Sequence, residues 1–149
     1  MKQLDVDTGT AKDMAIVSMQ IAYENLVDGC ALLHHNRARA AANRLYYAVY
    51  RAIAAVHALD GNSYRKHKDA LGQFNKLYLK DEIFSRKYGE MLYHLQQVRH
   101  ISDYDMREPD IDELKSYAVC AKAFCDELRL YCEKKLFCNI DVEIPMVEI

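Results

Sequence analysis

One short polar segment of this chain combines four side chains that carry chemistry in many proteins. Residues 96–105 read QQVRHISDYD, which places Arg99, His100, Asp103 and Tyr104 within two helical turns. Histidine exchanges protons near neutral pH, and arginine binds phosphate through charged hydrogen bonds. An exposed pair of Arg99 with Asp103 would stabilise its own helix by only about 0.3 kcal/mol. We therefore expect Arg99 to reach a neighbouring helix, either in a functional site or in a structural network.

A second group of candidate side chains lies earlier in the chain. Arg44 and Arg51 are seven residues apart, so they fall on one stripe of a helix with Tyr47 between them. Either the arginines pair with acids on a neighbouring helix, or Arg44 holds an anion or a partner. Arg51 and His57 also form an arginine–histidine pair, but a six-residue step turns their side chains about 120° apart, so we treat this pair as a coincidence.

His67 is the histidine with the most suggestive position. It lies near the start of an expected helix, in line with the apolar Leu71. A histidine on an apolar face is commonly a hydrogen-bonded core residue. The alternative is a polar pocket in which His67 meets Arg99, Asp103 and Arg44.

The composition bounds the class of protein. The chain has 149 residues, of which 51% are apolar and 28% are charged, as expected for one globular domain with one core. The formal net charge of −2 excludes the strongly basic balance of a nucleic-acid coat protein. Any contact with RNA or DNA would therefore need a local basic patch.

Neither a membrane anchor nor a metal site is expected. The longest run without a charge, residues 14–23, has ten residues, whereas a membrane-spanning helix needs about 20. The first residues, MKQLDVDTG, have acids where a secretory signal has its apolar core, so we expect a cytoplasmic protein. The five cysteines form no C-x-x-C pair, and no histidine is spaced as a zinc partner, so we expect no disulfide framework, no metal and no cofactor. Cys125 and Cys132 share a helix face and are expected in the core.

The apolar periodicity predicts an all-α protein, namely an antiparallel up-and-down bundle of about five helices with a short non-helical C-terminal tail. Only two prolines occur, Pro109 and Pro145, so nearly the whole middle of the chain can be helical. We expect residues 1–10 to lead into the bundle, residues 11–136 to form it and residues 137–149 to make the tail. The expected helix starts are Thr8 or Thr10, the alanine-rich segment after Arg37, Ser63, Ser85 and Pro109. The alanine-rich helix is expected at the centre of the bundle, because small side chains allow close approach.

The tail has a different period from the rest of the chain. In NIDVEIPMVEI, the apolar Ile140, Val142 and Ile144 alternate with polar residues, which is the period of a strand. The chain offers no second candidate strand to pair with it. We expect a disordered tail, and the alternative is a strand edge offered to a partner.

Three segments, taken in order, resemble the small bacterial and archaeal HEPN-domain proteins. They are AANRLYYAVYRAIAAVHALDG from residue 41, YRKHKDALGQFNKLYLK from residue 64 and VRHISDYD from residue 98. They contain an alanine-rich R-x-YYA helix, a K-H helix start and an R-x-x-x-DY cluster. The resemblance covers roughly residues 11–135 and implies a HEPN-like antiparallel helical bundle that forms a homodimer. We expect the dimer face on the polar and aromatic flank of the helix that carries Arg99.

The resemblance also implies a partner and an activity. Such proteins are often encoded beside a minimal nucleotidyltransferase, and the pair resembles a toxin–antitoxin module. In the ribonuclease members, an arginine followed four to six residues later by a histidine lies at the dimer cleft, and its proposed role is RNA cleavage without a metal. Arg99 matches this arginine, but Asp103 and Tyr104 stand where the histidine is expected. Whether the chain is an enzyme therefore stays open, and a metal-independent endoribonuclease is the expected activity if it is one.

Candidate roles follow from the resemblance together with the residue types. The competing hypothesis is a non-catalytic helical scaffold in which the cluster around Arg99 is structural. The candidate catalytic residues are Arg99, His67 and Asp103, the candidate nucleotide or RNA contacts are Arg44, Tyr47, Arg51 and His100, and the candidate acceptor of a nucleotide from the transferase is Tyr104.

Overall fold

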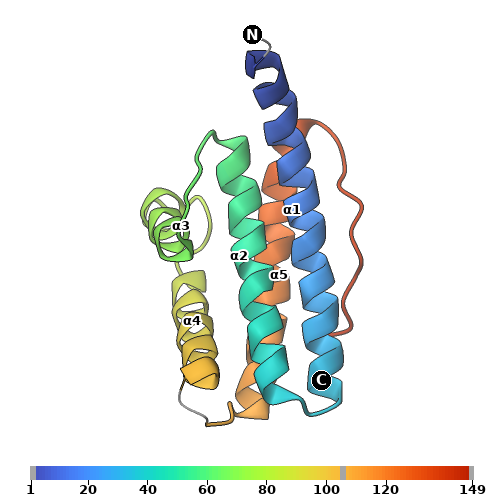
Figure 1. Cartoon of the computed structure of the whole chain (residues 1–149), viewed down its shortest axis with the longest axis vertical. Coiled ribbons are helices and arrows are strands. Elements are labelled where there is room, and N and C mark those ends of the chain that lie inside the picture. The colour runs from blue at the N-terminus through green and yellow to red at the C-terminus, as the bar shows by residue number, and fades with distance from the viewer. Residues whose placement is uncertain (1–2, 105–106, 148–149) are drawn as a thin grey trace.

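Helices form almost the whole of the protein. The computed structural model describes the backbone of residues 3–104 and 107–147 and the side chains of residues 11–100 and 107–147. Within these ranges there are five α-helices and no β-strand, as Figure 1 shows. The predicted all-α bundle is confirmed. The helices are α1 (Gln3–His34), α2 (Ala38–Leu59), α3 (His67–Phe74), α4 (Tyr88–Tyr104) and α5 (Ile111–Leu136), and a short π-helix, η1 (Asn75–Leu79), continues α3.

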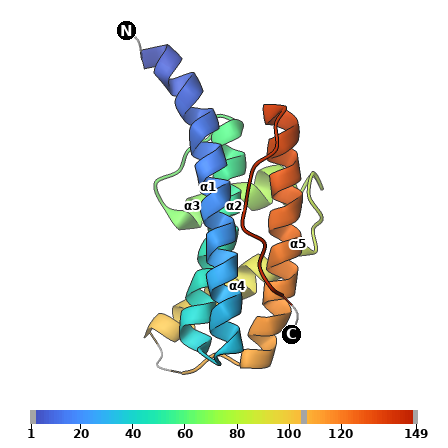
Figure 2. The ribbon, with the colours of Figure 1, turned by 90° about the vertical axis from the view of Figure 1, so that its right-hand side faces the viewer.

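Successive long helices run in opposite directions, so α1 and α4 are antiparallel to α2 and α5 (Figure 1). α1, α2 and α5 lie side by side, α4 lies beside α2, and α3 lies across the long axis of the bundle (Figures 1 and 2). α2 contacts α1, α3, α4 and α5, which confirms the central position predicted for the alanine-rich helix. Side chains that leave α2 can therefore meet residues from most of the chain.

Small side chains bring α1 and α2 close together. A Cβ atom added at Gly29 would lie 3.1 Å from Cδ2 of Leu45, so the glycine allows this contact. On α2, Ala41, Ala48 and Ala52 are completely buried. Close packing at these alanines holds the backbone of α2, and with it the direction of the polar side chains that α2 presents to α4.

Two helices begin away from the expected residues. α1 begins at Gln3, upstream of Thr8 and Thr10, because a residue that can cap a helix favours an end there but does not impose one. α3 begins at His67 rather than after Ser63, since Lys66 is extended and the ring of Tyr64 packs against His57 at 4.8 Å. The loop before α3 is thus held by the core, and His67 becomes the first residue of the helix.

The last two helix starts agree closely with their predicted signals. Ser85 Oγ accepts a hydrogen bond from the backbone N–H of Lys87 (3.3 Å), and α4 follows at Tyr88. Asp110, directly after Pro109, is the N-cap of α5, and its carboxylate accepts from the backbone N–H of Asp112 (3.0 Å).

The segment after α5 is extended and lies along α1 and α5 (Figure 2). Ile140 is 4% exposed, and its backbone N–H donates to the carboxylate of Glu133 (2.8 Å). The side-chain amide of Gln20 on α1 donates to the backbone oxygen of Asp141 (3.1 Å). This segment therefore differs from the expected disordered tail, because the buried positions of its strand-like pattern pack on apolar side chains of the same chain.

Candidate functional site

Arg99 of α4 reaches across to two tyrosines of α2. Its guanidinium carbon lies 4.8 Å from the ring centroid of Tyr46 and 5.3 Å from that of Tyr47. One guanidinium N–H group also donates to the hydroxyl of Tyr47 (3.3 Å). The positive charge lies against the electron-rich ring faces, where it is attracted. The expectation that Arg99 contacts a neighbouring helix agrees with this geometry.

His67 joins the same group of side chains from α3. Its ring stacks on that of Tyr50, with 3.7 Å between the centroids and 22° between the planes. Nδ1 of His67 lies 3.3 Å from the hydroxyl of Tyr46, the tyrosine that also supports Arg99. We call Tyr46, Tyr47, Tyr50, His67 and Arg99 the Arg99 cluster.

The surroundings favour the uncharged form of His67. Burial lowers the pKa of its imidazole, and the positive charges of Arg99 and Arg51 lower it further. Burial raises the pKa of the Tyr46 phenol, although Arg99 acts in the opposite direction. At neutral pH the cluster therefore holds a neutral imidazole and a neutral phenol beside a guanidinium.

Arg44 adds a second guanidinium on the other flank of Tyr47. Its guanidinium carbon lies 5.7 Å from the Tyr47 ring centroid. It donates to the side-chain oxygens of Asn25 (3.0 Å) and Asn43 (2.7 Å), and the amide of the buried Asn25 donates in turn to the backbone oxygen of Ile21. The acceptors of both Arg44 bonds are neutral amide oxygens, so these bonds do not neutralise the charge of Arg44. Two cations thus flank one half-buried phenol, an arrangement suited to an anion.

Four further predicted site residues are not members of the Arg99 cluster as defined above. The side chains of two of them are described, and those of the other two are not. Arg51 is exposed and influences His67 through its charge. His100 is also exposed. Asp103 and Tyr104 belong to the backbone of α4, but their side chains lie outside the described residues.

His57 is a structural residue. It is 2% exposed, and its Nε2–H donates to the backbone oxygen of Ala70 (2.9 Å), which ties α3 to α2. Arg51 is exposed, so the two members of the Arg51–His57 pair lie in different environments. This separation agrees with the expectation that their spacing is a coincidence.

Sequence reasoning missed three contributors to the site: Tyr46, Tyr50 and Asn25. Tyr46 is 1% exposed and is the residue shared by His67 and Arg99. The four-residue step from Tyr46 to Tyr50 puts both phenols on one side of α2, and this spacing was a usable signal. The role of Asn25 had no such signal, because it depends on how α1 packs against α2.

Other polar groups connect the helices far from the cluster. Asp60, at the end of α2, accepts hydrogen bonds from Tyr78, Tyr131 (2.7 Å) and Lys135. Tyr23 of α1 donates to Asp126 of α5 and accepts from Arg129 (3.1 Å). These groups stabilise the bundle by joining its ends and its first and last helices.

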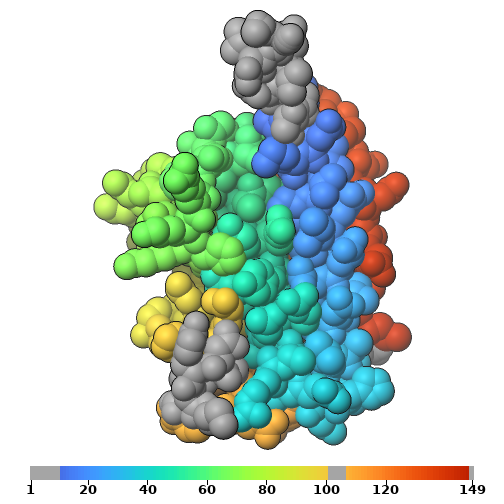
Figure 3. Space-filling view, viewed as in Figure 1, coloured from blue at the N-terminus to red at the C-terminus, as the bar shows by residue number. Residues whose placement is uncertain are grey.

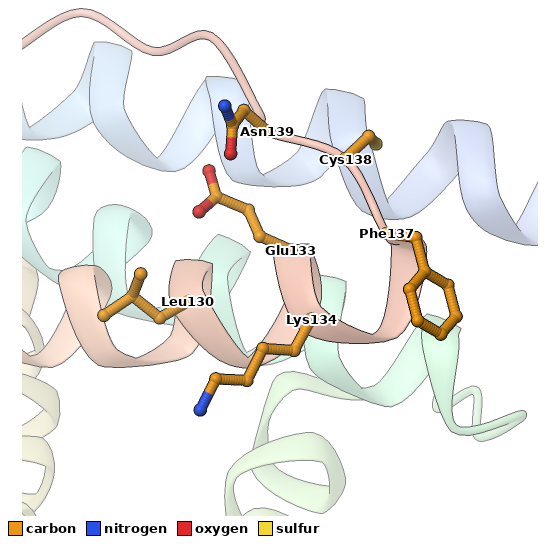
Figure 4. A pocket seen from close by; sticks show the side chains of 6 residues that line it. All are labelled: Leu130, Glu133, Lys134, Phe137, Cys138 and Asn139. Atoms are coloured by element: carbon orange, nitrogen blue, oxygen red, sulfur yellow. The ribbon is translucent and has the colours of Figure 1, made fainter.

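The described residues contain no group of three or more His, Cys, Asp or Glu side chains gathered as for a metal ion. Cys125 and Cys132 are completely buried, as expected for core residues. None of the described helices has the length and apolar character needed to cross a bilayer. An open hollow of about 430 Å³ lies at the C-terminal end of α5, away from the Arg99 cluster (Figure 4).

The Arg99 cluster lies where α2, α3 and α4 meet, and Figure 3 shows these three helices together on one face of the molecule. Tyr47, Tyr50, His67 and Arg99 are all partly exposed. A ligand approaching this face would meet aromatic rings and guanidinium groups together. This combination suits a phosphate that carries a planar base.

Comparisons with known proteins agree with this architecture. A family model described as HEPN domain matches residues 17–131. The chain is 29% identical over 108 residues to a UPF0332 protein of Thermotoga maritima, a match that covers 72% of this chain and 82% of that protein. It is 23% identical over 113 residues to a UPF0332 protein of Pyrococcus horikoshii, covering 76% of this chain and 80% of that protein. No solved structure gives a significant match. The matched range spans most of the chain and all the helices that form the Arg99 cluster, and the chain belongs to the HEPN domain family.

Proposed function

We propose that this protein acts as the HEPN partner of a minimal nucleotidyltransferase in a pair of the toxin–antitoxin kind, and that its Arg99 cluster binds the phosphate of a nucleotide or of RNA. The observation that carries the proposal is the support of Arg99 on the rings of Tyr46 (4.8 Å) and Tyr47 (5.3 Å). A guanidinium held in this way loses little side-chain entropy when a phosphate binds. Arg44, on the other flank of Tyr47, is the second cation of the proposed site.

Binding measurements test the phosphate site directly. We would titrate a fluorescently labelled single-stranded RNA of about ten nucleotides, and separately ATP, into the purified protein. Arg99→Ala should weaken binding at least tenfold, because one charged phosphate contact is lost. Arg86→Ala is the matched control, since Arg86 is exposed near the start of α4 and donates to the backbone oxygen of Lys80. Equal binding by both variants would remove Arg99 from the site.

The more specific version of this proposal is that the protein is a metal-independent ribonuclease. In the tautomer of His67 in which Nδ1 carries the hydrogen, Nδ1–H donates to the Tyr46 oxygen. Nε2 then keeps its lone pair and can accept the proton of a ribose 2′-hydroxyl. The 2′-oxygen would then bond to the adjacent phosphorus, the bond to the 5′-oxygen would break, and water would protonate that leaving oxygen. Arg99 would stabilise the charge on the phosphate. His67 would in this way supply from α3 the histidine that does not follow Arg99 in the sequence.

Cleavage of a single-stranded transcript in EDTA tests this activity. Both His67→Gln and Arg99→Ala should abolish cleavage while circular dichroism shows a folded protein. Cleavage that persists in both variants would exclude these residues from the chemistry. Binding without any cleavage by the unaltered protein would restrict the function to a nucleotide-binding or RNA-binding module.

The second candidate function is a non-catalytic scaffold, favoured by the burial of Tyr46 at 1% exposure beneath Arg99. In that case the cluster serves to join α4 to α2. The scaffold predicts that Arg99→Ala destabilises the fold and that the unaltered protein binds neither RNA nor ATP. Tight binding that depends on Arg99 would contradict it.

Tyr104 is proposed as the acceptor of a nucleoside monophosphate from the transferase. Its hydroxyl oxygen would attack the α-phosphorus of a nucleoside triphosphate, and pyrophosphate would leave. Co-expression with a nucleotidyltransferase encoded beside this chain, followed by intact-mass analysis, tests this role. A mass gain of one or more nucleotide units that disappears in Tyr104→Phe would support it, and an unmodified chain would exclude it.

The proposal also includes a homodimer. The flank of α4 that was expected to form its face contains the exposed Tyr93 (58%), Gln97 and His100. Sedimentation velocity over a range of protein concentrations measures the oligomeric state. A monomer at every concentration would contradict the dimer.

A further inference from the structure

One imidazole, that of His57, contacts both α3 and the loop that precedes it. The residue lies in the last turn of α2 and is 2% exposed. Its Nε2 atom lies 2.9 Å from the backbone oxygen of Ala70 on α3. The ring of Tyr64, from the loop, packs edge to face on the same imidazole, with 4.8 Å between the centroids. The position of α3 on α2 therefore depends on one buried, titratable ring.

The hydrogen bond to Ala70 defines which nitrogen of His57 carries the hydrogen. A carbonyl oxygen can only accept, so Nε2 carries the hydrogen and Nδ1 carries a lone pair. Nδ1 is buried and has no hydrogen-bond partner among the described residues. Protonation of the ring would place a charged N–H group at this position. A buried charged donor without an acceptor is strongly disfavoured.

The surroundings of His57 favour its neutral form. The titratable groups around it are Asp60 of α2, Tyr64 of the loop and Tyr78 of η1, together with Tyr131 and Lys135 of α5, which bond to Asp60. Burial lowers the pKa of the His57 imidazole below its ordinary 6.5 and outweighs the opposing effects of the bond to Ala70 and of the charge of Asp60. The neutral ring is thus the form that fits the docked α3.

The start of α3 can separate from α2 while the rest of the bundle stays packed. α3 has eight residues and lies across the bundle (Figure 1), and α1, α2 and α5 contact one another without it. Its last residue, Phe74, is completely buried, and the Phe74 ring contacts that of Phe124 on α5. Residues 67–69, at the other end of α3, are partly or fully exposed. Release would therefore begin at the end of α3 that carries His67.

We propose that His57 is a pH-sensitive latch for α3: its neutral ring holds the start of α3 on α2, and a proton at Nδ1 releases it. His67 is the first residue of α3, so release takes its ring away from Tyr46 and Tyr50 and out of the Arg99 cluster. The latch itself depends only on the packing of α3. Its consequence for binding or cleavage, a site that loses its imidazole in acid, rests on the proposed function.

Proton linkage gives the direction and the size of the effect. A released His57 would titrate with its ordinary pKa of 6.5, whereas the docked ring binds a proton only at a lower pH. Docking of α3 is therefore most stable above pH 6.5 and weakens as the pH falls below this value. At pH 5.5 the released form should be roughly tenfold more populated than at pH 7.5, since one pH unit below the pKa corresponds to a factor of ten.

Hydrogen exchange of backbone amides tests the latch in the whole protein. Protection factors, corrected for the pH dependence of the chemical exchange step, would be compared at pH 7.5 and pH 5.5. In the unaltered protein the protection of the Ala70 and Leu71 amides should fall at least fivefold, while the amides of α5 keep theirs. His57→Gln should show no such fall, because its side-chain N–H can donate to Ala70 but does not titrate. An equal fall in His57→Gln, or no fall in the unaltered protein, would overturn the proposal.

Two further measurements separate His57 from His67, the other histidine at this contact. His67→Gln should keep the fall in protection, and its disappearance there would assign the acid sensitivity to His67 and reject the latch. At pH 7.5, NMR of the ring nitrogens in the unaltered protein should show a neutral His57 with its hydrogen on Nε2. A charged ring, or a hydrogen on Nδ1, would reject the latch whatever the behaviour of His57→Gln. No nucleotide or RNA takes part in these experiments, so their outcome is independent of the proposed function.

Discussion

The imidazole ring of His67 lies nearly parallel to the phenol ring of Tyr50, with 3.7 Å between the ring centroids. This contact joins the first residue of α3 to the middle of α2. Burial lowers the pKa of His67, and the charges of Arg99 and Arg51 lower it further. We expect the stacked Tyr50 ring to contribute to this burial by limiting the access of water to the imidazole. The pKa of His67 should therefore depend on its contact with Tyr50.

Removing the Tyr50 ring should raise the pKa of His67. Tyr50→Ala would expose the imidazole to water, and hydration favours its charged form. An NMR titration of the His67 ring protons measures the change. Tyr93→Ala is the control, because Tyr93 is 58% exposed and its ring contacts His94 rather than His67. An unchanged or lower pKa in Tyr50→Ala would show that the stacked ring does not determine the state of His67.

Arg99→Ala should lower the free energy of unfolding by about 2 kcal/mol, the sum of two cation–π contacts and one hydrogen bond. For a chain of this length the melting temperature would fall by roughly 4–8 °C. Arg86→Ala should change the unfolding free energy by less than about 0.5 kcal/mol, since its side chain is exposed. Equal melting temperatures for the two variants would mean that Arg99 adds nothing to stability.

Asp60 should make the fold sensitive to acid. Burial acts to raise the pKa of its carboxyl, but hydrogen bonds from Lys135, Tyr78 and Tyr131 outweigh this effect and lower it. A carboxyl whose pKa is lowered by folding contributes stability that is present above its unfolded pKa of 3.8 and is lost as the pH falls through the folded value. Urea unfolding between pH 7 and pH 3 measures this loss. Asp60→Asn should be less stable at pH 7 and should lose less stability on acidification.

If the Asp60→Asn protein loses as much stability on acidification as the unaltered chain, the loss is caused by other carboxyl groups. Asp81→Asn is a suitable control because Asp81 is exposed. It should leave the unfolding free energy nearly unchanged at each pH.

The extended segment after α5 should contribute to stability through Ile140. Ile140→Ala should lower the free energy of unfolding by about 2 kcal/mol or more, since the side chain is 4% exposed. Ile144→Ala makes the same chemical change at a residue that is 64% exposed and should cost less than about 0.5 kcal/mol. Chemical denaturation compares the two variants. Equal losses would show that the segment does not pack on the bundle in solution.

Several features of the fold followed from local patterns alone. The apolar period and the scarcity of Pro and Gly predicted the helices, and the alanines of α2 predicted its central position. Local signals also gave the starts of α4 and α5 to within a few residues, because capping depends on groups close in the chain. The start of α3 was misjudged because the core contact of Tyr64 with His57 keeps the preceding loop extended.

The sequence by itself determined the class of fold, the family and the candidate polar residues, since each depends on residue types and their spacing along the chain. Only the tertiary structure decided which of these residues meet. Arg99, Tyr46 and His67 come from three helices, and their contacts depend on how closely and at what angle α3 and α4 pack on α2. The same holds for the tail, whose alternating pattern could not indicate that Ile140 is buried and that the tail backbone hydrogen-bonds to side chains of α1 and α5 of the same chain. Periodicity specifies the face of an element that is apolar, whereas the partner of that face is specified by the packing of the whole chain.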